Sequence, residues 1–408
     1  MSKHYTFVDV MGNRVFHRWW DGTRSCIDVV DSFPLELYIH GKTHDSTSIY
    51  GDPLSRMTFT QPSDMKGFIE EHQDLIEIHG QTSIAHQFIS HTYPGEIDFS
   101  MKGFVIANLD IETKYDNTGF PNPHQAKQEI SAITVKIAGA SGFVTFGTKA
   151  YEPVNEDMYF RAENEELMLV SFIGWWSRTQ PDIITGWNVA GFDIPYLVNR
   201  LVKVLGEGIA NKLSPFHNRT KNVFTETKLA GDDTSYRILG ITVYDYLELY
   251  KKFTLGSRES YSLDFICQYE LGVGKIEFEG DLMNLYNTDH QKYIEYNIHD
   301  VRLVEMLDEK MAFLQQAIAV AYTGKVKFHE IFGQVKWWDT HIYNELLLKN
   351  IQIPPQPATP NHEGIEGAFV KDARPALYKW LMAVDLTSLY PSILMAGNMS
   401  PETLVVPG

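Results

Sequence analysis

The pattern of apolar and polar residues changes near residue 103. Residues 1–102 form short β-type runs separated by turns such as Gly51–Pro53 and Tyr93–Gly95. From Gly103 onward, β-type runs and amphipathic helical runs follow one another along the chain. The β-type runs of this second region are Phe104–Thr113, Ala132–Ala138, Phe143–Phe146 and Asp182–Trp187.

Helical patterns lie between and after these runs. Asn164 is predicted to begin a helix over Glu165–Arg178, which Pro181 ends. One face of that helix carries Leu167, Val170, Ser171 and Gly174. A second helix begins near Pro195 and carries Leu197, Leu201, Val204 and Leu205, and a long helical region runs from about Thr288 to Tyr322. This alternation predicts a mixed α/β domain over roughly residues 104–312.

Two polar or irregular stretches interrupt the pattern. Lys212–Asp233 is polar and mildly basic, which fits either a solvated loop or a hairpin that contacts DNA. A proline-rich break at residues 354–360 indicates a crossing between domains. After it, Leu381–Asp385 is predicted to be an apolar strand that ends in an aspartate.

Length and composition narrow the class of protein. A chain of 408 residues is expected to form two to four domains. Cys26 and Cys267 lie far apart and offer no disulfide framework or cysteine-based zinc spacing. The sequence has neither an apolar signal core nor a run of about 18 apolar residues, so we expect neither secretion nor membrane insertion.

The net charge of −17 argues against a protein that coats nucleic acid electrostatically. It does not exclude an enzyme acting on nucleic acid, because such an enzyme concentrates positive charge locally and uses carboxylates to bind metal ions. An acidic enzyme is therefore the expectation from charge alone.

Two acidic residues end the first predicted strand of the α/β region. Side chains two positions apart on a strand point the same way, so Asp110 and Glu112 share a face while Ile111 packs inward. Two carboxylates so placed can share one divalent ion or bridge a pair of ions. Taken alone, Asp-Ile-Glu is a common sequence and has a purely structural explanation.

Three further residues add to this pair. Asp193 stands at a strand-to-helix junction, where α/β folds gather ligands; the structural alternative is the N-cap of the Pro195 helix. Tyr296 and Asp300 are four positions apart on a predicted helix, so the hydroxyl and the carboxylate share a face. Each feature alone is unremarkable.

Together the residues form an ordered pattern. Four acids converging on one face would repel each other strongly unless cations neutralise them. Ligand sets made of oxygen atoms select Mg²⁺ or Mn²⁺. Two such ions about 3.5–4 Å apart activate a water molecule and stabilise the leaving oxygen of a phosphodiester. The pattern therefore predicts a two-metal nuclease site.

The ordered set resembles the exonuclease motifs of the DEDD nuclease superfamily. Tyr296 resembles the mark of the tyrosine subclass, since the histidine subclass would carry histidine where this chain has Glu295. The resemblance implies a 3′→5′ exonuclease in which Tyr296 orients the attacking water. It implies four metal ligands, namely Asp110, Glu112, Asp193 and Asp300.

Longer stretches resemble the family B DNA polymerases, specifically those of T-even-type bacteriophages. They are Gly186–Asn199, Tyr244–Phe253, Asp289–Asp300 and Asp385–Ile393, the last of which matches the first palm motif. The resemblance implies an α/β (α+β multidomain) protein with an RNase H-like exonuclease domain over 104–312. It also implies a β-rich N-terminal domain over 1–103, to which 313–355 returns, and the beginning of a palm domain over 356–408.

The resemblance also assigns residues to the substrates. Asp385 would bind the polymerase metals, and Leu386, Ser388 and the Leu389 amide would lie at the triphosphate. Tyr390 would stack under the sugar and exclude a 2′-hydroxyl. At the exonuclease site, Asn188 and Phe192 would contact the DNA strand. Lys275 resembles a family lysine near that site; a solvated turn lysine is the alternative. The loop 215–240 would be the hairpin that helps to separate primer from template.

Motifs that polymerisation requires are missing from these 408 residues. We find neither a second palm aspartate pair within Asp-Thr-Asp nor a fingers helix with Lys-x-x-x-Asn-Ser-x-Tyr-Gly. One palm aspartate cannot hold two metals over a triphosphate, so this chain alone is expected not to polymerise. Two explanations stay open: a split polymerase completed by a second chain with fingers, thumb and the rest of palm, or a shortened chain.

The expected function is that of a proofreading 3′→5′ exonuclease of a phage replicative polymerase. It would use two Mg²⁺ or Mn²⁺ ions on the single-stranded 3′ end of a primer and on primer-template DNA. It would act in the cytoplasm of the infected bacterial host and contact a sliding clamp only indirectly. The alternatives are a stand-alone nuclease and a non-catalytic nucleic-acid-binding or regulatory module.

Overall fold

The structure is a computed structural model that describes residues 3–114, 121–228, 234–354, 367, 369–372, 374–400 and 403. The chain divides into two compact units, Met1–Gln356 and Pro357–Gly408, which are described separately. Most of the proline-rich break predicted at residues 354–360 lies outside the described residues. Among the residues described, no helix is long and apolar enough to cross a membrane.

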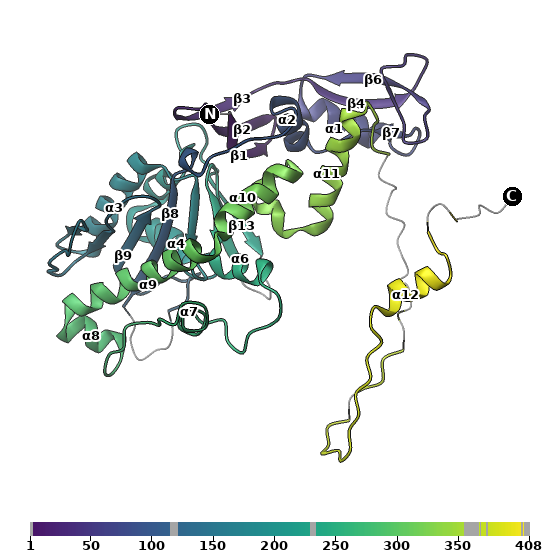
Figure 1. Ribbon diagram of the computed structural model, residues 1–408. Coiled ribbons are helices and arrows are strands. Elements are labelled where there is room, and N and C mark those ends of the chain that lie inside the picture. Colours follow the sequence, from purple (N-terminus) through teal and green to yellow (C-terminus); the bar gives the residue numbers. More distant parts are fainter. Residues whose placement is uncertain are drawn as a thin grey trace. The chain divides into compact units, whose positions relative to one another are not determined.

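A six-stranded sheet in the order β11-β10-β9-β8-β12-β15 forms the centre of the first unit (Figure 1). β8 pairs antiparallel with β9 and parallel with β12, and β12 pairs parallel with β15. The predicted mixed α/β class is thereby confirmed. The strands are β8 (Ile106–Thr113), β9 (Ile130–Ile137), β10 (Val144–Gly147), β11 (Met158–Arg161), β12 (Ile183–Gly186) and β15 (Thr242–Asp245).

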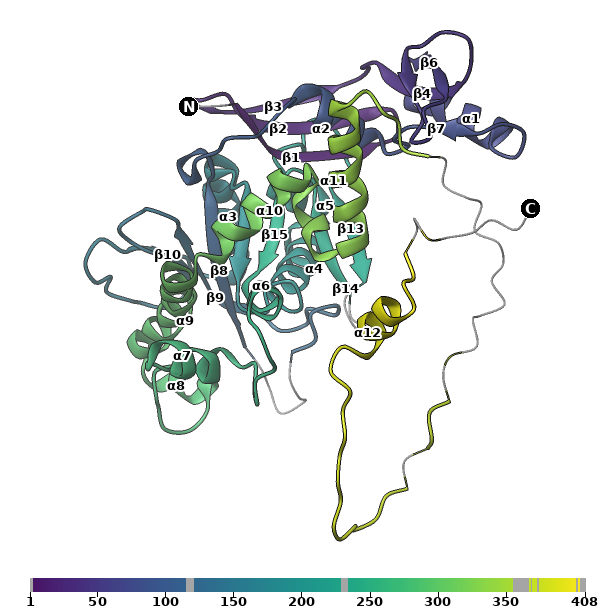
Figure 2. The same cartoon turned by 45° about the vertical axis from the view of Figure 1, so that its right-hand side comes forward.

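Helices cover both faces of this sheet (Figure 2). On one face, Leu109 and Ile111 of β8 share a core with α3 (Glu165–Thr179) and α4 (Asp193–Leu205). Because side chains alternate along a strand, Asp110 and Glu112 point to the opposite face. That face is covered by α9 (His290–Met311), whose Tyr293, Ile294, Ile298 and Val301 pack with Ala132 and Phe143.

The structure shows which face of one predicted helix is buried, and it corrects the length of another. The face of α3 with Leu167, Val170, Ser171 and Gly174 is turned to solvent, since Leu167 and Val170 are nearly half exposed. The buried face contains Met168, Leu169, Phe172, Ile173 and Trp176, because those larger side chains fill the space against the sheet. The long helix expected up to Tyr322 is interrupted at Ala312, whose φ of 53° is left-handed. α10 (Phe313–Gly324) starts after it.

Further helices connect or flank these elements within the first unit. The short helices are α5 (Glu207–Ala210), α6 (Tyr246–Phe253), α7 (Leu263–Leu271), α8 (Leu282–Thr288), η1 (Met101–Gly103), η2 (Asn211–Leu213) and η3 (Phe328–Phe332). α11 (Gln334–Leu348) follows η3. β13 (Phe224–Lys228) and β14 (Thr234–Ile238) form an antiparallel hairpin. Residues 229–233 of the loop predicted as a DNA-contacting hairpin lie outside the described part.

The N-terminal region contains two antiparallel sheets, in the orders β1-β2-β3 and β5-β6-β4-β7. The later segment 313–352 contacts them: the Tyr5 hydroxyl donates to Val326 O (2.7 Å), and Ser46 Oγ donates to Asn350 O (2.6 Å). The elements are β1 (His4–Met11), β2 (Arg14–Trp20), β3 (Ser25–Val30), β4 (Leu35–His40), β5 (Ser46–Thr47), β6 (Pro53–Phe59), α1 (Pro62–His72), β7 (Ile78–His79) and α2 (Ile84–Thr92).

A buried ion pair joins the N-terminal strands to the central sheet. Arg18 Nη2 of β2 lies 2.9 Å from Asp182 Oδ1, directly before β12, and both side chains are at most 3% exposed. The Arg18 guanidinium also donates to the carbonyls of Gln180, Pro181 and Gly240. The Val105 amide donates to the second Asp182 oxygen, so strand β12 is held beside the start of β8.

The second unit contains one helix among its described residues, α12 (Leu389–Ala396), which buries none of its side chains. The prediction of a strand over Leu381–Asp385 is wrong in this structure, because these residues have no regular secondary structure. A strand is stabilised by hydrogen bonds to a neighbouring strand. The described residues of this unit form no strand that could pair with Leu381–Asp385.

Candidate active site

Three carboxylates come together where β8 faces α9. One ligand oxygen from each of Asp110, Glu112 and Asp300 lies within 4.8 Å of the others. Asp110 and Glu112 are partly exposed, whereas Asp300 is buried. The period of two on the strand and the helical position of Asp300 therefore bring the predicted residues together as the sequence pattern indicated.

The register between β8 and α9 is held by two asparagines. Asn297 Nδ2 donates to Asp110 Oδ2 at 2.6 Å, which fixes the orientation of that carboxylate. Asn108 Nδ2, two residues before Asp110 on the same face of β8, donates to Val301 O at 2.7 Å. The helix and the strand are thus held together within three residues of the carboxylates.

Lys275 reaches the same group. Its Nζ donates to Asp300 Oδ2 (2.6 Å) and to the Tyr296 hydroxyl (3.0 Å). Its backbone is held by Asp264 Oδ1, which accepts from the Lys275 amide at 2.8 Å. The alternative of a solvated turn lysine does not describe this position, since the side chain is two-thirds buried between charged and aromatic partners.

Asp193 lies beside this trio and is not a member of it. The N-cap interpretation is wrong: α4 begins at Asp193 itself, and Phe192 precedes it without a side-chain cap. Asp193 Oδ1 instead accepts a hydrogen bond from the Ile111 amide at 2.9 Å. The carboxylate is thereby attached to the strand segment between Asp110 and Glu112, at the carboxyl end of β12.

The turn that delivers Asp193 depends on a buried acid. Asp245, at the end of β15, accepts from the amides of Asn188 and Ala190 at 3.0 Å each. Asn188 is left-handed (φ 59°), and its side-chain oxygen would lie 2.6 Å from a Cβ at Gly191, so a larger residue there would displace the Asn188 side chain. Phe192 packs against Tyr196 with ring centroids 5.4 Å apart.

Burial and mutual repulsion shift the acids in one direction. Burial, followed by the charge of Asp300, raises the pKa of Asp110 to about 7. Burial and the neighbouring carboxylates raise the pKa of Glu112 and of Asp193 well above their ordinary values. Burial also raises the pKa of Asp300 although Lys275 opposes it. Unlike the acids, Lys275 stays charged: burial disfavours its charge, but Asp300 and Tyr296 together outweigh this and raise its pKa.

The donor atoms fit a hard divalent cation. All ligand atoms of the trio are carboxylate oxygens, the type that Mg²⁺ and Mn²⁺ prefer. Asp300 Oδ1 is buried and has no hydrogen-bond partner among the described residues, which is costly for a carboxylate without a cation. The site is therefore a candidate metal centre.

The remaining predicted residues lie elsewhere. Asp385 and Leu386 are in the second unit, ahead of a turn, and Ser388 is left-handed (φ 51°) directly before α12. Leu389 and Tyr390 form the first turn of that helix.

In the first unit, a cavity of about 780 Å³ extends from the Asn188 turn to the β13–β14 hairpin. Its lining includes the basic residues Lys228, Arg237 and Lys251.

Four residues that hold the site, Asn108, Asn297, Asp245 and Asp264, had no role predicted from the sequence. Asn297 lies inside Asp289–Asp300, and Asp245 lies inside Tyr244–Phe253. Both stretches resemble the polymerase family, but the resemblance assigned neither residue a role. Their position next to predicted ligands, or at the end of a predicted strand, was the available signal. Asp264 had none, because its link to Lys275 depends on how the loop after α7 folds back.

Comparisons with known proteins show which family this chain resembles. Residues 72–266 match the family model "DNA polymerase family B, exonuclease domain", and residues 335–408 match "DNA polymerase family B". The DNA-directed DNA polymerase of Escherichia phage RB69 is 34% identical over 99% of this chain and 48% of its own length. That of Enterobacteria phage T4 is 31% identical over the same shares. The DNA polymerase delta catalytic subunit of Glycine max is 27% identical over 79% of this chain and 31% of its own length.

These matches confirm the resemblance stated on the sequence motifs, and the RNase H-like exonuclease domain fits the observed sheet. The chain spans about half the length of the phage relatives. The activities of those whole proteins therefore apply to this chain only as proposals.

The raised pKa of Asp110 generates a prediction about stability. An aspartate in an unfolded chain titrates at about 3.9, so between that pH and about 7 the folded chain holds a proton that the unfolded chain releases. Stability should therefore fall as the pH rises through this window when divalent ions are chelated. Asp110→Asn removes the carboxyl that ionises, so the stability of this variant should fall less as the pH rises. It should be more stable than the parent at about pH 8.

Thermal unfolding in a chelator, followed across this pH range, measures the effect. Adding Mg²⁺ should raise the melting temperature of the parent chain and leave that of Asp110→Asn nearly unchanged. Glu309→Gln removes an exposed carboxylate from α9, the helix that carries Asp300, and is the control. A stability difference between Asp110→Asn and the parent that does not depend on pH would contradict the assignment.

Proposed function

Since this chain belongs to DNA polymerase family B through its exonuclease domain (residues 72–266) and its polymerase segment (335–408), we propose that it is a 3′→5′ exonuclease acting on DNA. The observation that carries the proposal is the convergence of Asp110, Glu112 and Asp300 beside Tyr296 and Lys275. We assign the removal of nucleotides from the 3′ end of a primer strand to this site.

The four acids are assigned to two ions. The ligand oxygens of Asp110, Glu112 and Asp300 lie within 4.8 Å of one another. Asp193 lies next to them, hydrogen-bonded to the Ile111 amide. When bound, two Mg²⁺ or Mn²⁺ ions would supply an activated water and stabilise the leaving oxygen of the phosphodiester. The protein contributes the fixed spacing of the oxygens, which Asn297 and the β8–α9 contact maintain.

Tyr296 and Lys275 are assigned to the reacting phosphate. The Tyr296 hydroxyl lies one helical turn before Asp300, where it can orient the attacking water. Lys275 Nζ, 3.0 Å from that hydroxyl, keeps its positive charge and can stabilise negative charge developing on the phosphate. Phe278 packs edge-on against the Tyr296 ring (centroids 5.4 Å apart) and limits its rotation.

The DNA strand is assigned to the side of the site that carries Asn188 and Phe192. Asn188 is held in its left-handed conformation by Asp245, and Phe192 offers a ring next to Asp193. Aromatic rings of this kind stack on bases without regard to sequence. The β13–β14 hairpin, with Lys228 and Arg237 on the adjoining cavity, is proposed to help separate primer from template.

The second unit is assigned to the polymerase site. Asp385 would hold a polymerase metal, Leu386, Ser388 and Leu389 would lie at the triphosphate, and Tyr390 under its sugar. Ser388 precedes the N-terminus of α12, whose free amides suit a phosphate. Polymerisation needs further acidic and basic residues, which fingers, thumb and the rest of palm would supply. The nuclease would then proofread for this assembly in the cytoplasm of the infected host, with the sliding clamp contacted only indirectly.

The nuclease assignment is tested on single-stranded DNA labelled at either end. Asp110→Ala combined with Glu112→Ala should abolish Mg²⁺-dependent release of mononucleotides from the 3′ end. Asp300→Ala should lower turnover by orders of magnitude while DNA binding persists, because the loss falls on the transition state. Tyr296→Phe should cost less, since it removes a positioning hydroxyl and no ligand. Glu309→Ala is the control on the same helix.

Two results would count against this assignment. If the double variant releases nucleotides at the parent rate, the carboxylates are not the catalytic ligands and a non-catalytic binding module explains the chain better. If products appear from the 5′ end, the polarity is wrong.

Polymerisation is tested by mixing. The chain alone should extend no primer when given deoxynucleotides, and adding a polypeptide with the fingers, thumb and remaining palm should restore extension. Asp385→Ala should abolish the restored extension and leave the nuclease rate unchanged. Nuclease activity without any extension in the mixture would favour a stand-alone exonuclease.

A further inference from the structure

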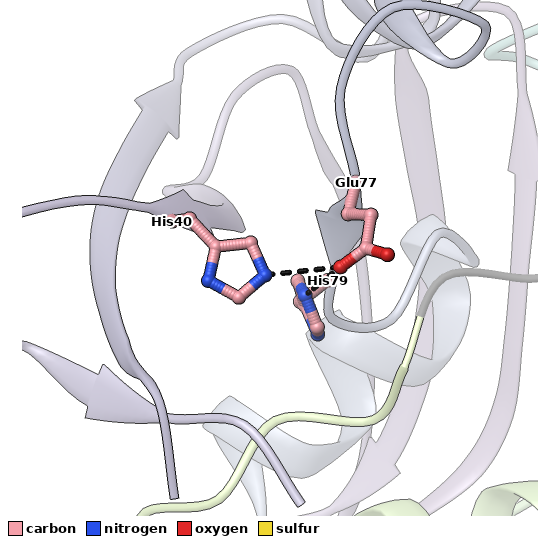
Figure 3. Close-up of side chains that lie close together, drawn as sticks. All are labelled: His40, Glu77 and His79. Atoms are coloured by element: carbon pink, nitrogen blue, oxygen red, sulfur yellow. Dashed lines mark hydrogen bonds and ion pairs between the residues drawn. The ribbon is translucent and has the colours of Figure 1, made fainter. Parts of the chain in front are cut away.

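A second group of metal-binding side chains lies far from the carboxylates, in the β5-β6-β4-β7 sheet of the N-terminal region (Figure 3). It consists of His40 at the end of β4, His79 at the end of β7, and Glu77 directly before β7. One ligand atom from each of the three lies within 4.8 Å of the others. Nothing in the proposed exonuclease or polymerase chemistry uses these residues.

The strand register explains why they meet. β4 and β7 are antiparallel, with Tyr38 opposite His79 and Ile39 opposite Ile78, so His40 and Glu77 are the next opposed pair. Residues two apart on a strand face the same side, which places His79 on the face of Glu77, and Tyr38 on that of His40. All three side chains therefore project from one face at the edge of the sheet.

The separations suit a small metal ion. Glu77 Oε2 is 3.0 Å from His40 Nε2 and 3.7 Å from His79 Nε2. Ligands each about 2.0–2.1 Å from a tetrahedral Zn²⁺ ion lie roughly 3.3–3.4 Å from one another. The observed distances lie on either side of that value, so small side-chain rotations would complete the geometry.

The state of His79 is an independent observation. Its side chain is 3% exposed, and neither ring nitrogen has a hydrogen-bond partner among the described residues. A buried polar group without a partner is costly, and a metal ion would satisfy it. His40 and Glu77 are 46% and 66% exposed, which leaves the ion a path from solvent.

We propose that His40, Glu77 and His79 bind one divalent transition-metal ion of the Zn²⁺ class, with water as the fourth ligand. Two imidazoles and one carboxylate favour such an ion over Mg²⁺, which prefers oxygen ligands. The ion would join β7, only two residues long, to β4. It would also strengthen the attachment of the segment around Ile353, whose carbonyl accepts from the Gly80 amide next to His79.

Zn²⁺ titration of the full 408-residue chain by calorimetry tests the proposal. The chain should carry Asp110→Ala and Glu112→Ala so that the exonuclease carboxylates do not compete, with Mg²⁺ present in excess. We expect one bound equivalent and a rise in melting temperature. Co²⁺ should give the visible absorption of a four-coordinate ion with nitrogen ligands.

Adding His40→Ala or Glu77→Gln should weaken Zn²⁺ binding at least about tenfold and remove the rise in melting temperature. Both side chains are exposed, so the fold should persist, which circular dichroism can verify. His44→Ala, an exposed histidine on the following loop, is the matched control and should bind like the parent. Absence of binding in the parent, or equal binding in His40→Ala and His44→Ala, would overturn the proposal.

Discussion

The crowding of carboxylates between β8 and α9 is the constraint on which the rest of the structure depends. Three acidic side chains that share a space within 4.8 Å, one of them buried, repel one another and lose hydration. The raised pKa values of Asp110, Glu112, Asp193 and Asp300 express that cost. Lys275 offsets part of it, and the proposed cations would offset the rest.

The scaffold holds the acids in place against this repulsion. The Asn108 and Asn297 side chains fix the helix against the strand, and Asp245 shapes the turn before Asp193. Further away, the buried Arg18–Asp182 pair joins β2 to the start of β12, and removing either partner would leave an uncompensated buried charge at a cost of about 3–5 kcal/mol. These contacts outside the carboxylate cluster thus hold the positions of the four acids.

Much of this arrangement could be predicted from local patterns. The period of two along Phe104–Thr113 placed Asp110 and Glu112 on one face, and the four-residue spacing placed Tyr296 beside Asp300. Predictions failed where the outcome depended on packing across the chain. The helical region expected over Thr288–Tyr322 is interrupted at Ala312, and Leu381–Asp385 has no strand to pair with among the described residues of its unit. His40 and His79 meet only through strand pairing, so no local spacing could indicate their cluster.

The crowded carboxylates between β8 and α9 are proposed to hold two divalent ions. The most direct measurement is a crystal structure of the chain with Mn²⁺ and a single-stranded oligonucleotide, with anomalous scattering used to locate the metal. We expect two Mn²⁺ peaks about 3.5–4 Å apart, bounded by Asp110, Glu112, Asp193 and Asp300. Crystals that bind the oligonucleotide yet show no Mn²⁺ between β8 and α9, with Lys275 as the sole counter-charge of Asp300, would contradict it.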